Sequence, residues 1–135
     1  MVKSIAWLLG WLLGLGLAAN GLVMMGIPDA WYANVPGAVD TGPFNAHFVR
    51  DVGAIYVTCG AAFLWFAASP PARPAAQIAA AFLAIHGLIH LRDAVAGREA
   101  VTQLLSDAPA VFLPPVLAIW IVLALPERRD RTFPE

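Results

Sequence analysis

The sequence predicts an all-α protein, a polytopic membrane four-helix bundle that forms a single domain over residues 1–135. Composition is the first reason, because 60% of the residues are hydrophobic and 13% are charged, whereas soluble domains are roughly 45–50% apolar and about 25% charged. The second reason is that the apolar residues fall into four runs, each near the ~17–25 residues that a helix needs to cross a bilayer. The alternating pattern of membrane β-strands is missing from the sequence, so helices are the expected spanning elements.

The first helix is expected at about residues 5–27. Its start imitates a signal peptide because Lys3 precedes an apolar run, but that run is longer than the apolar part of a typical signal. We therefore expect an uncleaved helix. Gly10, Gly14 and Ala18 lie one turn apart and predict a small-residue stripe against which another helix can pack closely.

The segment 28–43 is rich in proline and glycine and has no helical stripe. It is either an ordered cover over one end of the bundle or a mobile linker. Trp31 and Tyr32 are suited to the membrane interface. The second helix is expected at about 44–68, with proline in its first turn and Asn45 capping its free amide groups.

One face of the second helix combines polar and small side chains, because at ~100° per residue five such positions fall together: His47, Arg50, Asp51, Ala54 and Thr58. Polar groups in a membrane helix find partners inside the bundle. This face is therefore predicted to point inward.

The third helix is expected at about 75–97, after a connection of only a few residues that predicts an antiparallel hairpin. His86, His90 and Asp93 follow the i, i+4, i+7 spacing, which places them on one face. If positions are counted outward from the turn, Asp93 comes level with Arg50 of the second helix. The same count brings His90 within about one turn of Asp51.

The fourth helix is expected at about 108–125, with Pro109 in its first turn. Pro114 and Pro115 are expected to kink it, because proline removes backbone hydrogen bonds. The connection at 98–107 has apolar residues at helical spacing and predicts a short helix in the membrane interface.

Histidines and acids of the second and third helices are the candidate metal or cofactor site: His86, His90, Asp51, His47 and Asp93. Ionisable groups inside membrane helices are costly, so they indicate a functional site. Nitrogen and oxygen ligands on facing helices suit zinc, iron or copper, and a histidine could bind haem as an axial ligand. A proton or quinone relay would use the titration of histidine and aspartate. The alternative is that the cluster only fixes helix packing.

Charged residues near the same level form a second candidate set, consisting of Arg50, Arg92 and Asp93. They are either an ion pair that joins two helices or an anchor for an anionic group. No catalytic residue is identified, so the sequence leaves open whether the protein is an enzyme. The rival hypothesis is a membrane interaction or assembly protein without catalysis, which forms a homo-oligomer or joins a larger complex.

Lysine and arginine placement predicts the orientation in the membrane. Most of the basic residues fall on one side of the four-span arrangement: Lys3, Arg73, Arg128, Arg129 and Arg131. The positive-inside rule makes this side cytoplasmic. Both termini are then in the cytoplasm, and the candidate site opens toward the opposite face.

Motifs for soluble nucleotide chemistry are missing from the sequence, as is a basic surface for nucleic acid. The lipid bilayer is the expected partner. Four short helices, an inward N-terminus and a polar cluster near one face resemble the small DoxX-like bacterial inner-membrane proteins in topology. The resemblance implies the bacterial inner membrane as the location and carries over no catalytic residue.

Overall fold

The computed structural model describes residues 2–97 and 100–125 of the chain. All regular structure in these residues is helical, which confirms the all-α class. Three helices are long and apolar enough to cross a membrane: α1 (Val2–Gly26), α3 (Ala46–Ala68) and α4 (Arg73–Val95). A further apolar helical segment, Ala108–Ala124, is shorter. By length and composition, the chain is a multi-pass membrane protein.

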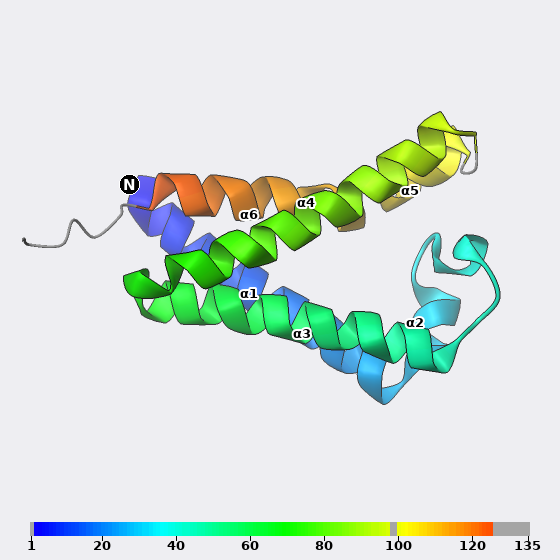
Figure 1. The fold of residues 1–135 in the computed structure, drawn as a ribbon, viewed down its shortest axis with the longest axis horizontal. Coiled ribbons are helices and arrows are strands. Elements are labelled where there is room, and N and C mark those ends of the chain that lie inside the picture. Colours follow the sequence, from blue (N-terminus) through cyan, green and yellow to red (C-terminus); the bar gives the residue numbers. More distant parts are fainter. Residues whose placement is uncertain (1, 98–99, 126–135) are drawn as a thin grey trace, which may run out of the picture.

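The helices are packed tightly at one end of the molecule and diverge toward the other (Figure 1). The turn η2 (Pro70–Ala72) joins α3 to α4, and α6 (Leu113–Ala124) packs against α4 and α1. The start of α1 and the end of α6 lie beside this turn. We call the end of the molecule that contains η2 the turn end. From there α3 and α4 separate toward the opposite end, which we call the open end.

Glycines allow α1 and α3 to pack closely along their length. A Cβ atom added at Gly21 would lie 2.4 Å from the Gly53 carbonyl oxygen, and one added at Gly60 would lie 2.6 Å from the Ala18 amide nitrogen. Such separations are too short for any side chain, so backbone meets backbone here. The predicted use of Gly14 and Ala18 as part of a packing stripe is thereby confirmed.

The second long helix begins slightly later than predicted. The side chain of Asn45 accepts hydrogen bonds from the amides of His47 (3.0 Å) and Phe48 (3.1 Å). This capping places the first helical residue at Ala46, so Pro43 lies before the helix and not in its first turn. The cap residue itself was identified correctly because its side-chain oxygen competes well for free amides.

The segment between α1 and α3 contains a short helix that its sequence did not predict. This helix, α2, spans Pro28–Asn34 and is followed by the single turn η1 (Ala38–Thr41). Proline and an acid in its first turn favour the helix start, but seven residues are too few for a readable stripe. The Nε1–H group of Trp31 donates to Asn20 Oδ1 (2.9 Å). The Trp31–Asn20 bond ties α2 to the end of α1.

The expected fourth helix is divided into α5 (Val101–Val111) and α6. Pro109 lies inside α5 and not in the first turn of a new helix, which corrects the predicted start. The break falls at Phe112, just before the expected kink. Its cause is the missing N–H groups of Pro114 and Pro115, which would otherwise bond back to residues 110 and 111.

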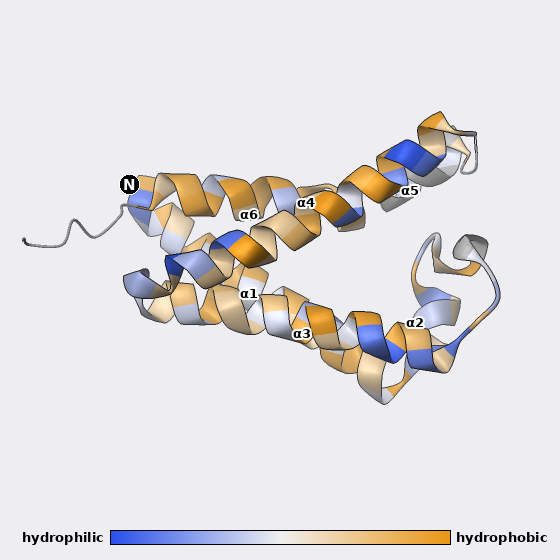
Figure 2. Ribbon diagram, viewed as in Figure 1, coloured by the Kyte–Doolittle hydropathy of each residue, from blue (hydrophilic) through white to orange (hydrophobic). Residues whose placement is uncertain are grey.

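The turn end holds the core of the molecule. Its largest fully buried side chains come from α3, α4 and α6 and from the residue that follows α6: Phe63, Phe66, Leu83, Ile121 and Leu125. Arg73 donates to the Leu125 carbonyl, and its guanidinium lies 5.9 Å from the centre of the Phe66 ring. These contacts close the turn end. Hydrophilic residues lie on α3 near the open end and on α4 toward both of its ends (Figure 2).

Candidate functional site

A large cleft occupies the space where the helices diverge. Its volume is about 1480 Å³, and its lining comes from α1, α3, α4, α5, α6 and the segment that contains α2. It extends from Leu9 on α1 to Asn45 at the open end, and most of its walls are apolar, with residues such as Leu17, Val52 and Leu117. Typical ligand pockets measure roughly 300–1,000 Å³, so this cleft is larger than a small ligand requires.

Aromatic rings and imidazoles form a cluster on the cleft wall. His86 on α4 lies 6.1 Å from the ring of Phe82 with the planes at 14°, and 6.1 Å from Tyr56 with the planes at 88°. The ring of His90 lies 4.9 Å from His86. These centroid distances are typical of stacked and edge-to-face pairs. All four residues line the cleft.

Two polar groups of this cluster have hydrogen-bonding capacity that the fold does not use. Tyr56 and His86 are both half-buried. Within residues 2–97 and 100–125, neither the Tyr56 hydroxyl nor a His86 ring nitrogen has a hydrogen-bond partner. His86 lies about 20 Å along α4 from its first residue, at ~1.5 Å per residue. At that depth an unsatisfied polar group is costly unless water or a ligand reaches it.

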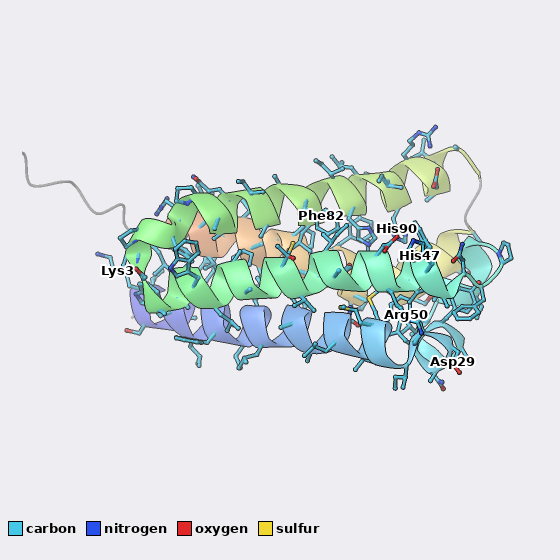
Figure 3. The ribbon with its side chains drawn as sticks, turned by 60° about the horizontal axis from the view of Figure 1, so that its bottom comes forward. Lys3, Asp29, His47, Arg50, Phe82 and His90 are labelled. Carbon is cyan, nitrogen blue, oxygen red and sulfur yellow. The ribbon has the colours of Figure 1, made fainter. Side chains whose placement is uncertain are left out.

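Three candidate residues of α4 are brought together as their spacing predicted. His86, His90 and Asp93 all line the cleft. They follow one another toward the open end, and Figure 3 shows His90 well beyond Phe82 in that direction. The Asp93 carboxylate also lies 3.1 Å from Nη1 of the neighbouring Arg92. The acid and the two imidazoles therefore form one polar wall.

The polar face of the second helix does not point inward, which corrects its predicted orientation. His47 Nε2 lies 3.4 Å from Asp51 Oδ2, but 86% and 61% of these side chains are exposed. Neither residue lines the cleft. The reason is that Gly53 and Gly60 must face α1 for the close contact, and this rotates the opposite side of α3 outward.

Arg50 is engaged with α1. Its Nε–H group donates to the Met25 carbonyl over 3.3 Å. Arg50, His47 and Asp29 all lie toward the open end, whereas Lys3 lies at the turn end (Figure 3). The roles of Arg50, Arg92 and Asp93 as an ion pair or an anion anchor stay predictions.

The described residues do not by themselves assemble a complete set of metal ligands. Among the residues that the structure describes, no group of three or more His, Cys, Asp or Glu side chains is placed to hold a metal ion. His86 and His90 share one helix, so they cannot bind a haem iron from opposite sides without rearrangement. Metal and haem binding stay predictions that an optical spectrum and elemental analysis would test.

Sequence reasoning missed Tyr56, Phe82 and Trp31 as lining residues of the site. Tyr56 is not part of the polar face that the spacing predicted for its helix. A signal was nevertheless present, because tyrosine is enriched at membrane interfaces and this one lies near the middle of a span. A buried tyrosine hydroxyl usually has a partner, which indicates a site.

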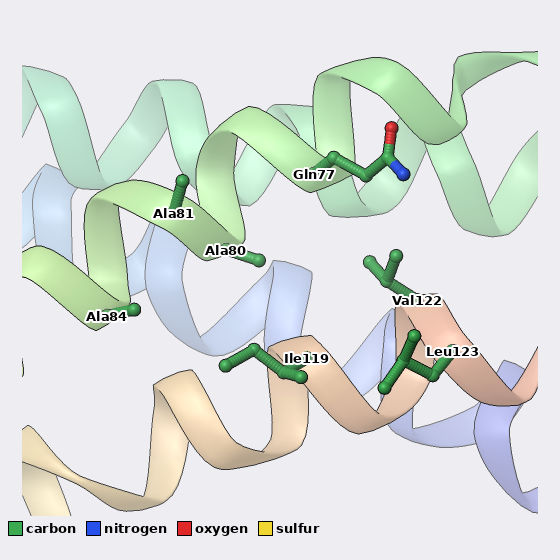
Figure 4. Close-up of a pocket in the computed structure, with 7 residues that line it drawn as sticks. All are labelled: Gln77, Ala80, Ala81, Ala84, Ile119, Val122 and Leu123. Atoms are coloured by element: carbon green, nitrogen blue, oxygen red, sulfur yellow. The ribbon is translucent and has the colours of Figure 1, made fainter.

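A second, smaller groove of about 210 Å³ lies between α4 and α6 (Figure 4). Gln77 contributes the polar part of its lining, and alanines with Ile119, Val122 and Leu123 supply the rest. This groove is a surface depression between packed helices. The large cleft is therefore the stronger candidate site.

Comparisons with protein-family models, with curated proteins and with solved structures each found no match to this chain.

Proposed function

We propose that the chain is a bacterial inner-membrane protein in which α5 and α6 together complete a fourth crossing and a four-helix bundle. Lys3 and Arg73 at the turn end support a cytoplasmic location for that end, with both termini inside. The DoxX-like topology that the sequence resembles has the same arrangement, and it stays part of this proposal. The cleft then opens toward the periplasm and the outer half of the bilayer.

We further propose that the cleft binds a lipid with a polar ring, of the quinone type. The observation that carries this proposal is the pairing of Tyr56 and His86, whose polar groups meet an apolar cleft without partners in the described chain. A ring carbonyl can accept a hydrogen bond from the Tyr56 hydroxyl or from a protonated ring nitrogen of His86. Either bond would offset the cost of burying the polar group.

The shape of the cleft supports a ligand with a tail. A polar ring can stack against the parallel rings of Phe82 and His86, while a long apolar chain extends along walls such as Leu13 and Leu117. A small ligand would leave much of the volume of about 1480 Å³ unfilled. A metal ion alone would leave the apolar walls without a role.

The competing explanation is that the cluster only fixes helix packing. The contact between Tyr56 and Phe82, with ring centroids 6.1 Å apart and planes at 90°, favours it because this pair already joins α3 to α4. The two explanations differ on the Tyr56 hydroxyl. Helix packing needs only the aromatic ring of Tyr56, whereas binding of the ligand also needs its hydroxyl oxygen.

Titration of the detergent-purified protein with decylubiquinone tests the proposal. Trp31 lines the cleft, so we expect saturable quenching of its fluorescence, which Trp31→Phe should largely remove. Tyr56→Phe keeps the ring and loses one hydrogen bond, so we expect binding about threefold to tenfold weaker. His47→Phe removes an exposed histidine outside the cleft and should bind like the wild type.

Unsaturable quenching in the wild type would contradict the proposal, and so would equal affinity in Tyr56→Phe and the wild type. Elemental analysis and an optical spectrum of the same sample test the remaining chemistries. A bound metal, or a Soret band that disappears in the double variant His86→Ala, His90→Ala, would replace the quinone proposal with a metal or haem protein.

A further inference from the structure

A strip of polar and small side chains runs along the outward face of α3. It consists of His47, Asp51, Ala54, Thr58 and Ala61, and all five residues are exposed. The spacing between successive members is 4, 3, 4 and 3 residues. We call this set the α3 strip.

The α3 strip differs from other outward faces of the molecule. Exposed positions on α1 and α4 carry large apolar side chains, among them Leu8, Leu15, Leu22, Ile85 and Leu88. Such residues suit contact with lipid tails. Charged side chains in membrane helices instead almost always face protein or water, and small residues mark the surfaces where helices meet. Lipid tails therefore do not account for the charged part of this face.

We propose that the α3 strip is the interface of a parallel homodimer, in which α3 of one copy packs against α3 of a second copy. The alternating spacing of 4 and 3 residues is that of the seam in a left-handed pair of helices. Two copies inserted in the same direction, related by a twofold axis along the membrane normal, bring equivalent seams together at equal depth. The small side chains at 54, 58 and 61 permit a close approach.

Charge is the reason to assign a second copy as the partner. Arg50 borders the α3 strip immediately before Asp51. In a parallel pair, a residue beside the seam lies against the seam position of the other helix. The two Asp51 carboxylates then face each other across the axis, and Arg50 of each copy lies beside Asp51 of the other, where its positive charge offsets the repulsion between them. The α3 strip with Arg50 is thus complementary in charge to the same surface of a second copy.

The polar groups of the strip are compatible with this contact. Thr58 Oγ1 donates to the Ala54 carbonyl of its own helix over 2.9 Å, so pairing would not leave that hydroxyl unsatisfied. Asp51 and His47 lie 3.4 Å apart in one chain, and Arg50 uses Nε for α1. The Arg50 guanidinium has five N–H donors in all. The bond to α1 uses one of them, which leaves donors for the Asp51 carboxylate of the other copy.

Single-molecule photobleaching of labelled full-length protein in dilute liposomes tests this dimer. We expect the wild type to be dimeric, and Ala61→Leu to weaken the association constant by about tenfold or more because bulk separates the two helices. Ala19→Leu is the matched control, since Ala19 is an exposed alanine of α1, and it should associate like the wild type. Wild-type protein that stays monomeric across the concentrations tested would overturn the proposal.

Cysteine crosslinking identifies the face that is used. In a Cys59→Ala background, Ala54→Cys should give a disulfide-linked dimer on oxidation, whereas Leu15→Cys on α1 should give little. Crosslinking through residue 15 but not 54 would overturn the proposal, because another face would then join the copies. Predominant linkage of residue 54 to a different membrane protein in native membranes would also overturn it.

Discussion

At the scale of single residues, the difference between the hydrogen of glycine and the methyl group of alanine decides how closely α1 and α3 can pack. Gly21 lies where an added Cβ would be 2.4 Å from the Gly53 oxygen and 2.7 Å from the Val57 nitrogen. Both neighbours are backbone atoms, which cannot move aside as a flexible side chain could. Glycine at this point is therefore a requirement of the fold.

Gly21→Ala should destabilise the protein. Because the methyl group forces α1 and α3 apart, we expect a loss of about 1–3 kcal/mol in the free energy of unfolding. Reversible unfolding in mixed detergent micelles, followed by circular dichroism, measures the effect.

Gly16→Ala is the matched control. Gly16 is in the same helix, and an added Cβ there would meet nothing within 4 Å. Alanine favours helix more than glycine, so stability should be unchanged or rise by up to about 1 kcal/mol. Equal losses in the two variants would show that close packing is not the cause.

At the scale of elements, the short helix α2 forms part of the cleft lining, and among the described residues one side-chain hydrogen bond joins it to α1. Trp31 donates to Asn20, and Tyr32 donates to the carbonyls of Val39 (3.3 Å) and Gly42. The first bond joins two elements, whereas the others lie within the segment 28–43. Loss of the Asn20 side chain should therefore release α2 without unfolding it.

Asn20→Leu should increase backbone exchange in residues 28–34 by about fivefold, since one hydrogen bond contributes about 1 kcal/mol. Hydrogen–deuterium exchange with mass spectrometry measures this change. Asn34→Ala is the control, because Asn34 Nδ2 donates to Ala30 of its own helix and does not tie α2 to α1. Unchanged exchange in Asn20→Leu would show that other contacts hold the helix.

At the scale of the whole molecule, the tight turn end and the diverging open end have different roles. Alanines and large rings fill the first, including Ala76, Ala80, Phe63 and Phe66. The second contains the cleft. A packed base can hold the helix ends in place while the other ends stay apart, which is the condition for a binding cleft within a small membrane protein.

The proposed orientation makes a direct prediction for cells. In a Cys59→Ala background, Val39→Cys at the open end should react with a membrane-impermeant maleimide in intact cells. Ser4→Cys at the turn end should react only after permeabilisation, because that end is placed in the cytoplasm. Both positions are exposed, so accessibility within the protein does not limit labelling. The reverse pattern would invert the topology.

The sequence determined much of the fold because its signals are local. Runs of apolar residues revealed the three long helices, the Asn45 cap followed from side-chain chemistry, and the small residues of α1 indicated close packing. The three cleft-lining residues of α4 could be grouped for the same reason. His86, His90 and Asp93 share a face because helical spacing alone puts them there.

Tertiary structure decided what spacing along one helix cannot express. Contact between Gly21 and Gly53 sets the rotation of α3, and this turned Tyr56 toward the cleft and His47 with Asp51 away from it. The divergence of α3 and α4 created the volume that the cleft occupies. These features depend on how whole surfaces of neighbouring helices fit together. The sequence thus determined which groups lie on each helix, and packing between helices decided which of those groups meet.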